Sequence, residues 1–125
     1  MIQSFRDLTV WQKSFELVTD VYKLTEQLPK NEEFGLVAQI RRCAVSLPSN
    51  IAEGQQRNNS KEYRHFLGIA KGSSAELETQ ILLAAKLYNV EAVQLLQKLE
   101  EIQKMLQTIM SKLSTRTSNL TTGVK

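Results

Sequence analysis

Residues 60–88, SKEYRHFLGIAKGSSAELETQILLAAKLY, carry the helical pattern from which the rest of the fold follows. Its apolar and small residues recur every three or four positions, which places them on one face of a helix for about seven turns. Asn59 and Glu62 form the pattern of a capping box, so we expect this helix to start near Ser60. Small residues such as Gly68 and Gly72 in its middle predict close approach of another backbone. The face consists of Tyr63, Phe66, Leu67, Ala70, Ser74, Leu77, Ile81, Ala84 and Tyr88.

A second helix is predicted before this stretch, at about residues 32–54. Pro48 lies inside its pattern and lacks a backbone donor, so we expect a kink or a break near residues 44–47. Gly54 is a plausible C-terminal stop, and residues 55–60 should form a loop. The apolar seam of this helix is Val37, Ile40, Ala44, Leu47 and Ile51.

Two further helices complete the pattern. A fourth helix is predicted after Asn89 as its N-cap, at about residues 90–113, with leucines and isoleucines at heptad spacing. The Ser/Thr-rich residues 114–125 have almost no apolar content and are predicted to be a disordered tail. Four long helices with short loops favour an all-α fold, an antiparallel up-and-down four-helix bundle over residues 1–113.

The first helix, at about residues 9–28, carries two apolar seams side by side, and Pro29 should end it. One seam can face the core, and the other then needs a cover, because an exposed aliphatic stripe is an aggregation liability. The first seam is Leu8, Trp11, Phe15, Val18 and Tyr22. The second seam, which we take as the candidate oligomer interface, is Val10, Leu17, Val21, Leu24 and Leu28.

Composition limits the possible chemistry. The chain has 125 residues, a formal net charge of +3, one Cys and one His. A single Cys excludes an internal disulfide and a zinc site built from cysteines. We expect no catalytic residue, metal site or cofactor. No targeting segment and no membrane span are apparent, so a bacterial-type cytoplasm is the expected location.

Three groups of residues suggest a chemical activity. Glu62 and His65 have the spacing of a di-iron pair, but that site needs a second His. Cys43 lies beside two arginines that could lower the pKa of its thiol, yet a small buried residue is the better interpretation. A metal-dependent or hydrolytic enzyme stays open as a third alternative. It would use Glu53, Glu62, Glu76 and Glu78.

Basic residues provide the clearest functional signal. Between Gln39 and Gly72 six cations stand against two acids. In an antiparallel hairpin we expect them to form one basic ridge that binds phosphates, with Arg42 near Lys71. The alternative is an ordinary solvated helical face. The six candidate nucleic-acid-binding residues are Arg41, Arg42, Arg57, Lys61, Arg64 and Lys71.

The sequence resembles the 23S rRNA-intervening sequence proteins, a four-helix-bundle family. The resemblance is carried by DLTVWQK at residues 7–13, by QIRRCAVSLPSNIAEG at residues 39–54 and by KEYRHFLGIAKGSSAELETQ at residues 61–80. It implies an up-and-down bundle that assembles into a cyclic homopentamer. It also implies kinship with the accessory protein of diversity-generating retroelements, whose basic pentamer binds nucleic acid and a reverse transcriptase.

We therefore expect a non-enzymatic homo-oligomeric bundle with a candidate role in binding RNA or DNA. The alternative is a structural scaffold that binds a protein partner and no nucleic acid.

Overall fold

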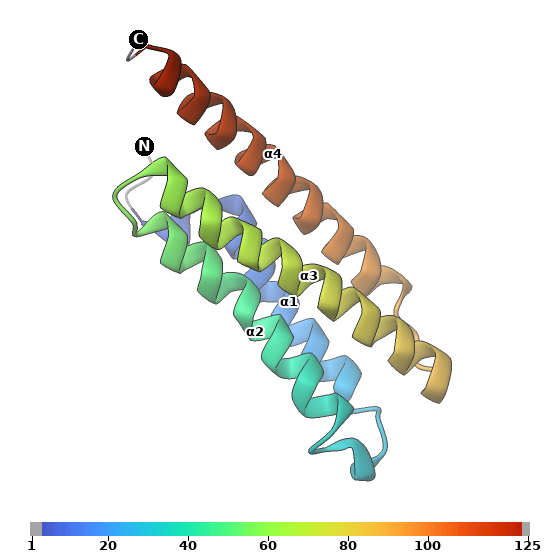
Figure 1. The fold of residues 1–125 in the computed structure, drawn as a ribbon. Coiled ribbons are helices and arrows are strands. Elements are labelled where there is room, and N and C mark those ends of the chain that lie inside the picture. The colour runs from blue at the N-terminus through green and yellow to red at the C-terminus, as the bar shows by residue number, and fades with distance from the viewer. Residues whose placement is uncertain (1–3, 124–125) are drawn as a thin grey trace.

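The computed structural model describes residues 4–123, with side chains as far as Ser114, and folds them into four long helices without a strand (Figure 1). Neighbouring helices run antiparallel, with α3 between α2 and α4 and with α1 behind. The predicted all-α four-helix bundle is confirmed. The elements are η1 (Phe5–Asp7), α1 (Thr9–Thr25), η2 (Lys30–Glu32), α2 (Leu36–Gln55), α3 (Ser60–Tyr88) and α4 (Val93–Gly123).

The core lies on the apolar faces that the spacing predicts. On α3, Leu67, Leu77 and Ile81 are fully buried, and the heptad residues Leu99 and Leu106 of α4 meet them in the same core. Burying one such side chain stabilises the fold by about 1.5–3 kcal/mol. Among the described residues, no helix combines the length and the apolar character needed to cross a membrane.

Asparagines fix both ends of α3. The Asn59 side chain accepts a hydrogen bond from the Glu62 backbone N–H at 2.8 Å and donates to the Glu62 carboxylate at 2.9 Å, so the predicted cap is confirmed. Asn89 adopts a left-handed conformation, with φ of 56°, and ends α3 rather than capping α4. The Glu91 carboxylate instead accepts from the Val93 N–H at 2.9 Å, where α4 begins.

The two helix boundaries on either side of Pro29 differ from the predicted ones. α1 ends at Thr25, because the residue before a proline avoids helical geometry and Leu28 precedes Pro29. η2 follows, and α2 begins only at Leu36. The Glu32 carboxylate joins these segments, because it accepts from the Leu36 N–H at 3.2 Å and from the Tyr88 hydroxyl. Those two hydrogen bonds lower the pKa of Glu32.

α2 continues through Pro48 without a break, contrary to one of the two expected outcomes. Pro48 cannot donate to the carbonyl of Ala44. Around it, the Ser46 hydroxyl donates to the Cys43 carbonyl at 2.6 Å and the Ser49 hydroxyl to the Val45 carbonyl at 2.9 Å. These side-chain donors bind the carbonyls on either side of the one that the proline leaves free.

The close backbone approach occurs at Gly54, not in the middle of α3. A Cβ on Gly54 would lie 2.8 Å from the Cβ of Phe66 and 3.2 Å from the carbonyl oxygen of Tyr63. At Gly72 a Cβ would have nothing within 4 Å. The prediction of close approach in the middle of α3 is therefore wrong for Gly72. Gly54 also lies within α2, which ends at Gln55, and its role is to let α3 come near.

The structure continues α4 as a helix to Gly123, past Leu113, where the sequence pattern ends. Side chains after Ser114 lie outside those described, as do residues 124–125. The predicted disorder of residues 114–125 stays a prediction.

Alanine substitution should have opposite effects on the free energy of unfolding at Gly54 and at Gly72. Gly54→Ala should lower the free energy of unfolding by about 1–3 kcal/mol, because the added methyl group meets backbone that cannot move aside. Gly72→Ala, the matched control, should raise it by up to about 1 kcal/mol through helix propensity. Urea denaturation followed by circular dichroism measures both. Equal stability of the two variants would contradict the close approach at Gly54.

Candidate nucleic-acid interface

The six predicted cations do not form one ridge. Arg41 turns toward α1, where its guanidinium lies 4.2 Å from the centre of the Tyr22 ring and donates to the Thr25 hydroxyl at 2.9 Å. Such a cation–π contact holds α2 on α1. Arg41 is therefore part of the packing between two helices.

Arg42 and Lys71 also lie apart, contrary to expectation. Arg42 lines a hollow between α2 and α3. Lys71 donates to the Gln107 side chain of α4, on the opposite side of α3. An antiparallel hairpin places Arg42 and Lys71 at similar positions along its axis, and the prediction rests on that. The position along the axis does not determine on which side of its helix a residue lies.

Arg57 and Lys61 meet at the turn between α2 and α3. They line a hollow of about 510 Å³ together with Glu62, His65 and Phe66. The guanidinium of Arg57 lies 4.8 Å from the centre of the Phe66 ring and forms an exposed ion pair with Glu53 at 3.2 Å. Exposed pairs of this kind contribute little free energy, so Arg57 can exchange its partner.

Three cations share the outer face of the first half of α3. Lys61, Arg64 and Lys71 are exposed and lie three and seven residues apart, on one side of the helix. We call them the basic stripe. Gly68, where an added Cβ would lie 3.7 Å from the Met110 side chain of α4, and the exposed Gly72 leave the surface between these cations low. The signal was in the sequence, in the spacing of cations and glycines, but the sum of charge from Gln39 to Gly72 obscured it.

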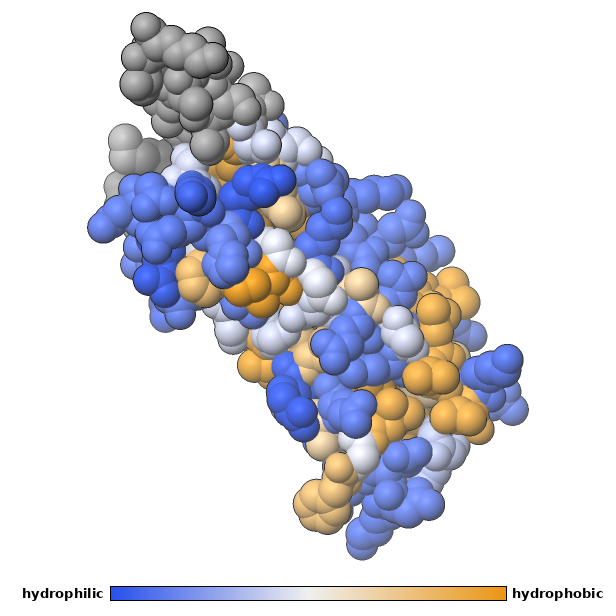
Figure 2. Space-filling view, in the orientation of Figure 1, coloured by the Kyte–Doolittle hydropathy of each residue, from blue (hydrophilic) through white to orange (hydrophobic). Residues whose placement is uncertain are grey.

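Few acidic residues lie near the basic stripe to neutralise its charge. Between Ser60 and Ala75 the only acid is Glu62, whose carboxylate accepts from the Asn59 side chain. In Figure 2 hydrophilic side chains cover the end of the molecule that holds the turn between α2 and α3. Hydrophobic ones gather toward the other end of α3, where Leu82, Leu83 and Leu87 are exposed.

The two apolar seams of α1 exchange the roles that the sequence analysis gave them. The second seam is buried within the chain itself and cannot contact another copy, so its assignment as the oligomer interface is wrong. Both seams are apolar, and only the partners supplied by α2 and α4 decide which one faces inward. The buried seam is Val10, Leu17, Val21, Leu24 and Leu28, each at most 8% exposed.

An aromatic surface takes its place on the outside. Phe15 is 57% exposed and stacks on Trp11 with ring centres 4.8 Å apart. Phe5 also packs against Trp11, with ring centres 5.2 Å apart, and Val45 and Pro48 of α2 close a hollow of about 400 Å³. We call Phe5, Trp11, Phe15, Val45 and Pro48 the aromatic face. The contribution of α2 to it could not be derived from the helical spacing of α1 alone.

The acids weighed for enzyme chemistry are not brought together. Glu53 pairs with Arg57, Glu62 binds Asn59, and Glu78 accepts from the Gln103 side chain of α4 at 3.0 Å. His65 is exposed. Among the described residues, no group of three or more His, Cys, Asp or Glu side chains could hold a metal ion.

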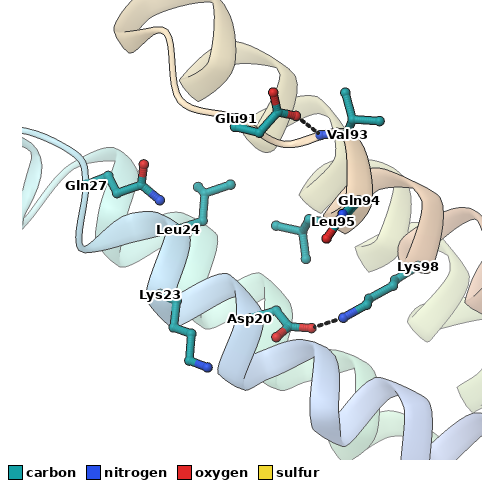
Figure 3. Close-up of a pocket in the computed structure, with 9 residues that line it drawn as sticks. All are labelled: Asp20, Lys23, Leu24, Gln27, Glu91, Val93, Gln94, Leu95 and Lys98. Atoms are coloured by element: carbon teal, nitrogen blue, oxygen red, sulfur yellow. Dashed lines mark hydrogen bonds and ion pairs between the residues drawn. The ribbon is translucent and has the colours of Figure 1, made fainter.

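A hollow of about 570 Å³ lies between α1 and the start of α4 (Figure 3). Leu24 and Leu95 point toward each other across it. Lys98 forms an ion pair with Asp20 at 2.9 Å, which raises the pKa of Lys98. This hollow therefore has an apolar floor and an ion pair that links the two helices.

Cys43 is buried between α2 and α3, and its thiol donates to the Ser73 carbonyl at 3.0 Å. Burial, and then the nearby Glu76 carboxylate, raise its pKa to about 11. Neither arginine beside it in the sequence lowers this pKa, and Arg41 turns away toward α1. The interpretation of Cys43 as a small buried residue agrees with its place in the core.

The thiol should be nearly unreactive in the folded protein. At pH 8 about one thiol in a thousand is ionised when the pKa is about 11, and the thiolate is the reactive form. Iodoacetamide should therefore label Cys43 far more slowly than in urea, and faster as the pH rises from 9 toward 11. Mass spectrometry measures the labelling, and equal rates with and without urea would contradict the burial.

The sequence is similar to a known protein family over most of its length. No curated protein matches the chain. The model of the 23S rRNA-intervening sequence protein family matches residues 6–108. The matched range includes the stretch that carries the basic stripe and extends into α4, beyond the motifs that the sequence analysis used. Because this range is most of the chain, the protein belongs to the 23S rRNA-intervening sequence protein family.

Proposed function

We propose that the protein is a non-enzymatic RNA-binding protein that holds single-stranded RNA on the basic stripe. The observation that carries the proposal is the set of exposed cations Lys61, Arg64 and Lys71 on one face without an acid among them. Phosphate contacts supply most of the affinity for nucleic acid. The low surface at Gly72 lets a sugar–phosphate backbone approach the helix.

The neighbouring hollow favours a single strand over a duplex. Lys61 belongs both to the stripe and to the hollow that contains His65 and Phe66. Unpaired bases stack on aromatic rings and on arginine planes, and Arg57 is already placed over Phe66. A strand on the stripe could therefore lay one base on this end of the bundle.

Charge reversal tests this proposal. Changing Lys61, Arg64 and Lys71 together to glutamate should abolish binding of fluorescein-labelled RNA in an anisotropy titration. The matched control changes the exposed Lys23, Lys30 and Lys86 to glutamate. It makes the same difference in net charge at the other end of the bundle and should retain most of the affinity.

The dependence of RNA binding on salt concentration gives a second test. Three phosphate contacts to a single strand should give a slope of about −2 for the logarithm of the binding constant against the logarithm of salt concentration. No binding at low salt, or equal loss in the two triple variants, would overturn the proposal.

A second candidate function is a scaffold that self-associates through the aromatic face. It is favoured by the exposure of Phe15 beside Trp11, because such patches mark interaction sites. The ring of five subunits implied by the resemblance is a prediction of this candidate. A scaffold that binds only a protein partner would use the same face.

Light scattering tests the self-association. The wild-type mass should be a multiple of 14.2 kDa at micromolar concentration, and Phe15→Glu should reduce it to one subunit. Leu87→Glu, at a residue that is 61% exposed near the other end of α3, is the control and should leave the mass unchanged. A single-subunit mass for the wild-type protein would remove this candidate.

A further inference from the structure

A hollow of about 470 Å³ between the middles of α2 and α3 has a polar lining that the fold does not explain. Its walls carry one cation, Arg42 from α2, and one anion, Glu76 from α3. Among the residues that the structure describes, neither forms an ion pair. Gln39, Ser46, Ser73 and Gln80 complete the polar lining.

The buried side chain of Gln80 suggests that this hollow is a binding site. Its side chain is only 7% exposed, and its amide oxygen is buried without a hydrogen-bond partner. A buried acceptor without a donor is costly. The terminal torsion of a glutamine is broad, so the amide can turn its oxygen toward the hollow. A ligand with an N–H group would then provide the missing donor.

The charges in the hollow are limited to these two groups. The thiol of Cys43 also lines it, but burial keeps that thiol protonated. The Ser46 hydroxyl already donates to a carbonyl, so it can offer only its oxygen. A fitting ligand is therefore uncharged inside the hollow, with N–H donors facing Glu76 and acceptors facing Arg42.

We propose that this hollow binds one unpaired guanine base, a proposal that deepens the RNA-binding function and rests on it. Guanine carries two adjacent N–H donors, at N1 and N2, which match the two oxygens of the Glu76 carboxylate. On its neighbouring edge O6 and N7 are acceptors, and arginine binds this pair with two hydrogen bonds. Gln80 lies one turn after Glu76 in the same lining, and its amide oxygen, once turned toward the hollow, would be the acceptor for the second N2 proton.

The other bases fit this arrangement less well. Adenine and cytosine place an acceptor beside their amino donor, and uracil has one donor between two acceptors, so a carboxylate meets repulsion in each.

The hollow is within reach of the basic stripe. Glu76 lies five residues after Lys71, which is about 8 Å along the helix axis and about 140° around it, so Lys71 faces α4 and Glu76 faces α2. Gly72, without a side chain, separates them. A strand whose phosphates lie on the stripe can therefore turn one base over Gly72 into the hollow.

Nucleotide titration of the full chain tests the proposal, with 5′-GMP, 5′-IMP and 5′-AMP followed by ¹H–¹⁵N correlation spectra. All three carry the same phosphate, so a difference between them reports on the base. GMP should bind about tenfold more tightly than AMP, which is within the range of discrimination that a bidentate contact to a base provides. IMP lacks the N2 amino group and should fall between them. The shifted amides should lie in residues 39–46 and 73–80.

Substitution of Glu76 makes the test specific. Glu76→Gln removes the charge from an exposed position and should reduce the preference for GMP over AMP severalfold, and Arg42, which still binds O6 and N7, should keep the remainder. Glu78→Gln, two residues further on α3 and outside the hollow, is the matched control and should keep the full preference. Equal affinity of the wild-type protein for GMP and AMP, or a preference that Glu76→Gln leaves unchanged, would overturn the guanine site.

A labelled uridine oligonucleotide, with and without a single guanine, separates the two proposals. Tighter binding of the guanine-containing strand supports the site. Binding that depends on the stripe cations but ignores the guanine would overturn the site and leave the proposed function standing. A preference for GMP without any oligonucleotide binding would support the site and overturn the proposed function.

Discussion

The contact between Gly54 and the first turns of α3 sets the geometry on which the candidate surfaces depend. At this point the Cβ of Phe66 and the carbonyl of Tyr63 come so near to α2 that no side chain fits between the helices. This approach closes the hairpin of α2 and α3 at the turn. It brings Arg57 over the ring of Phe66 and leaves Lys61 and Arg64 on the outside. A wider hairpin would separate the cation of α2 from the aromatic ring of α3.

Much of the fold could be predicted because helical spacing is a property of the sequence alone. The core face of α3 and its cap at Asn59 follow from that spacing and from local hydrogen bonds. Boundaries that depend on tertiary contacts could not be predicted in the same way. Asn89, for instance, suits the start of one helix and the end of another, and the Glu91 carboxylate decides between them.

The candidate site was predicted in composition but not in arrangement. The sequence shows which six residues are basic and on which helices they lie. The side of the helix on which each one lies depends on the neighbouring helices. Arg41 is held by Tyr22 and Thr25 of α1, which no pattern within α2 reveals. The same limit applies to the seams of α1, because two apolar stripes of similar strength can each serve as the core face.

Pro48 has a mechanical consequence for the two surfaces that α2 carries. A proline removes one rung from the hydrogen-bond ladder of the helix, and bending is easiest where a rung is absent. Val45 and Pro48 face the aromatic side, whereas Arg42 and Ser46 line the hollow toward α3. These residues of the two surfaces lie within about two turns of Pro48. A bend of α2 at Pro48 would therefore change the shape of both surfaces together.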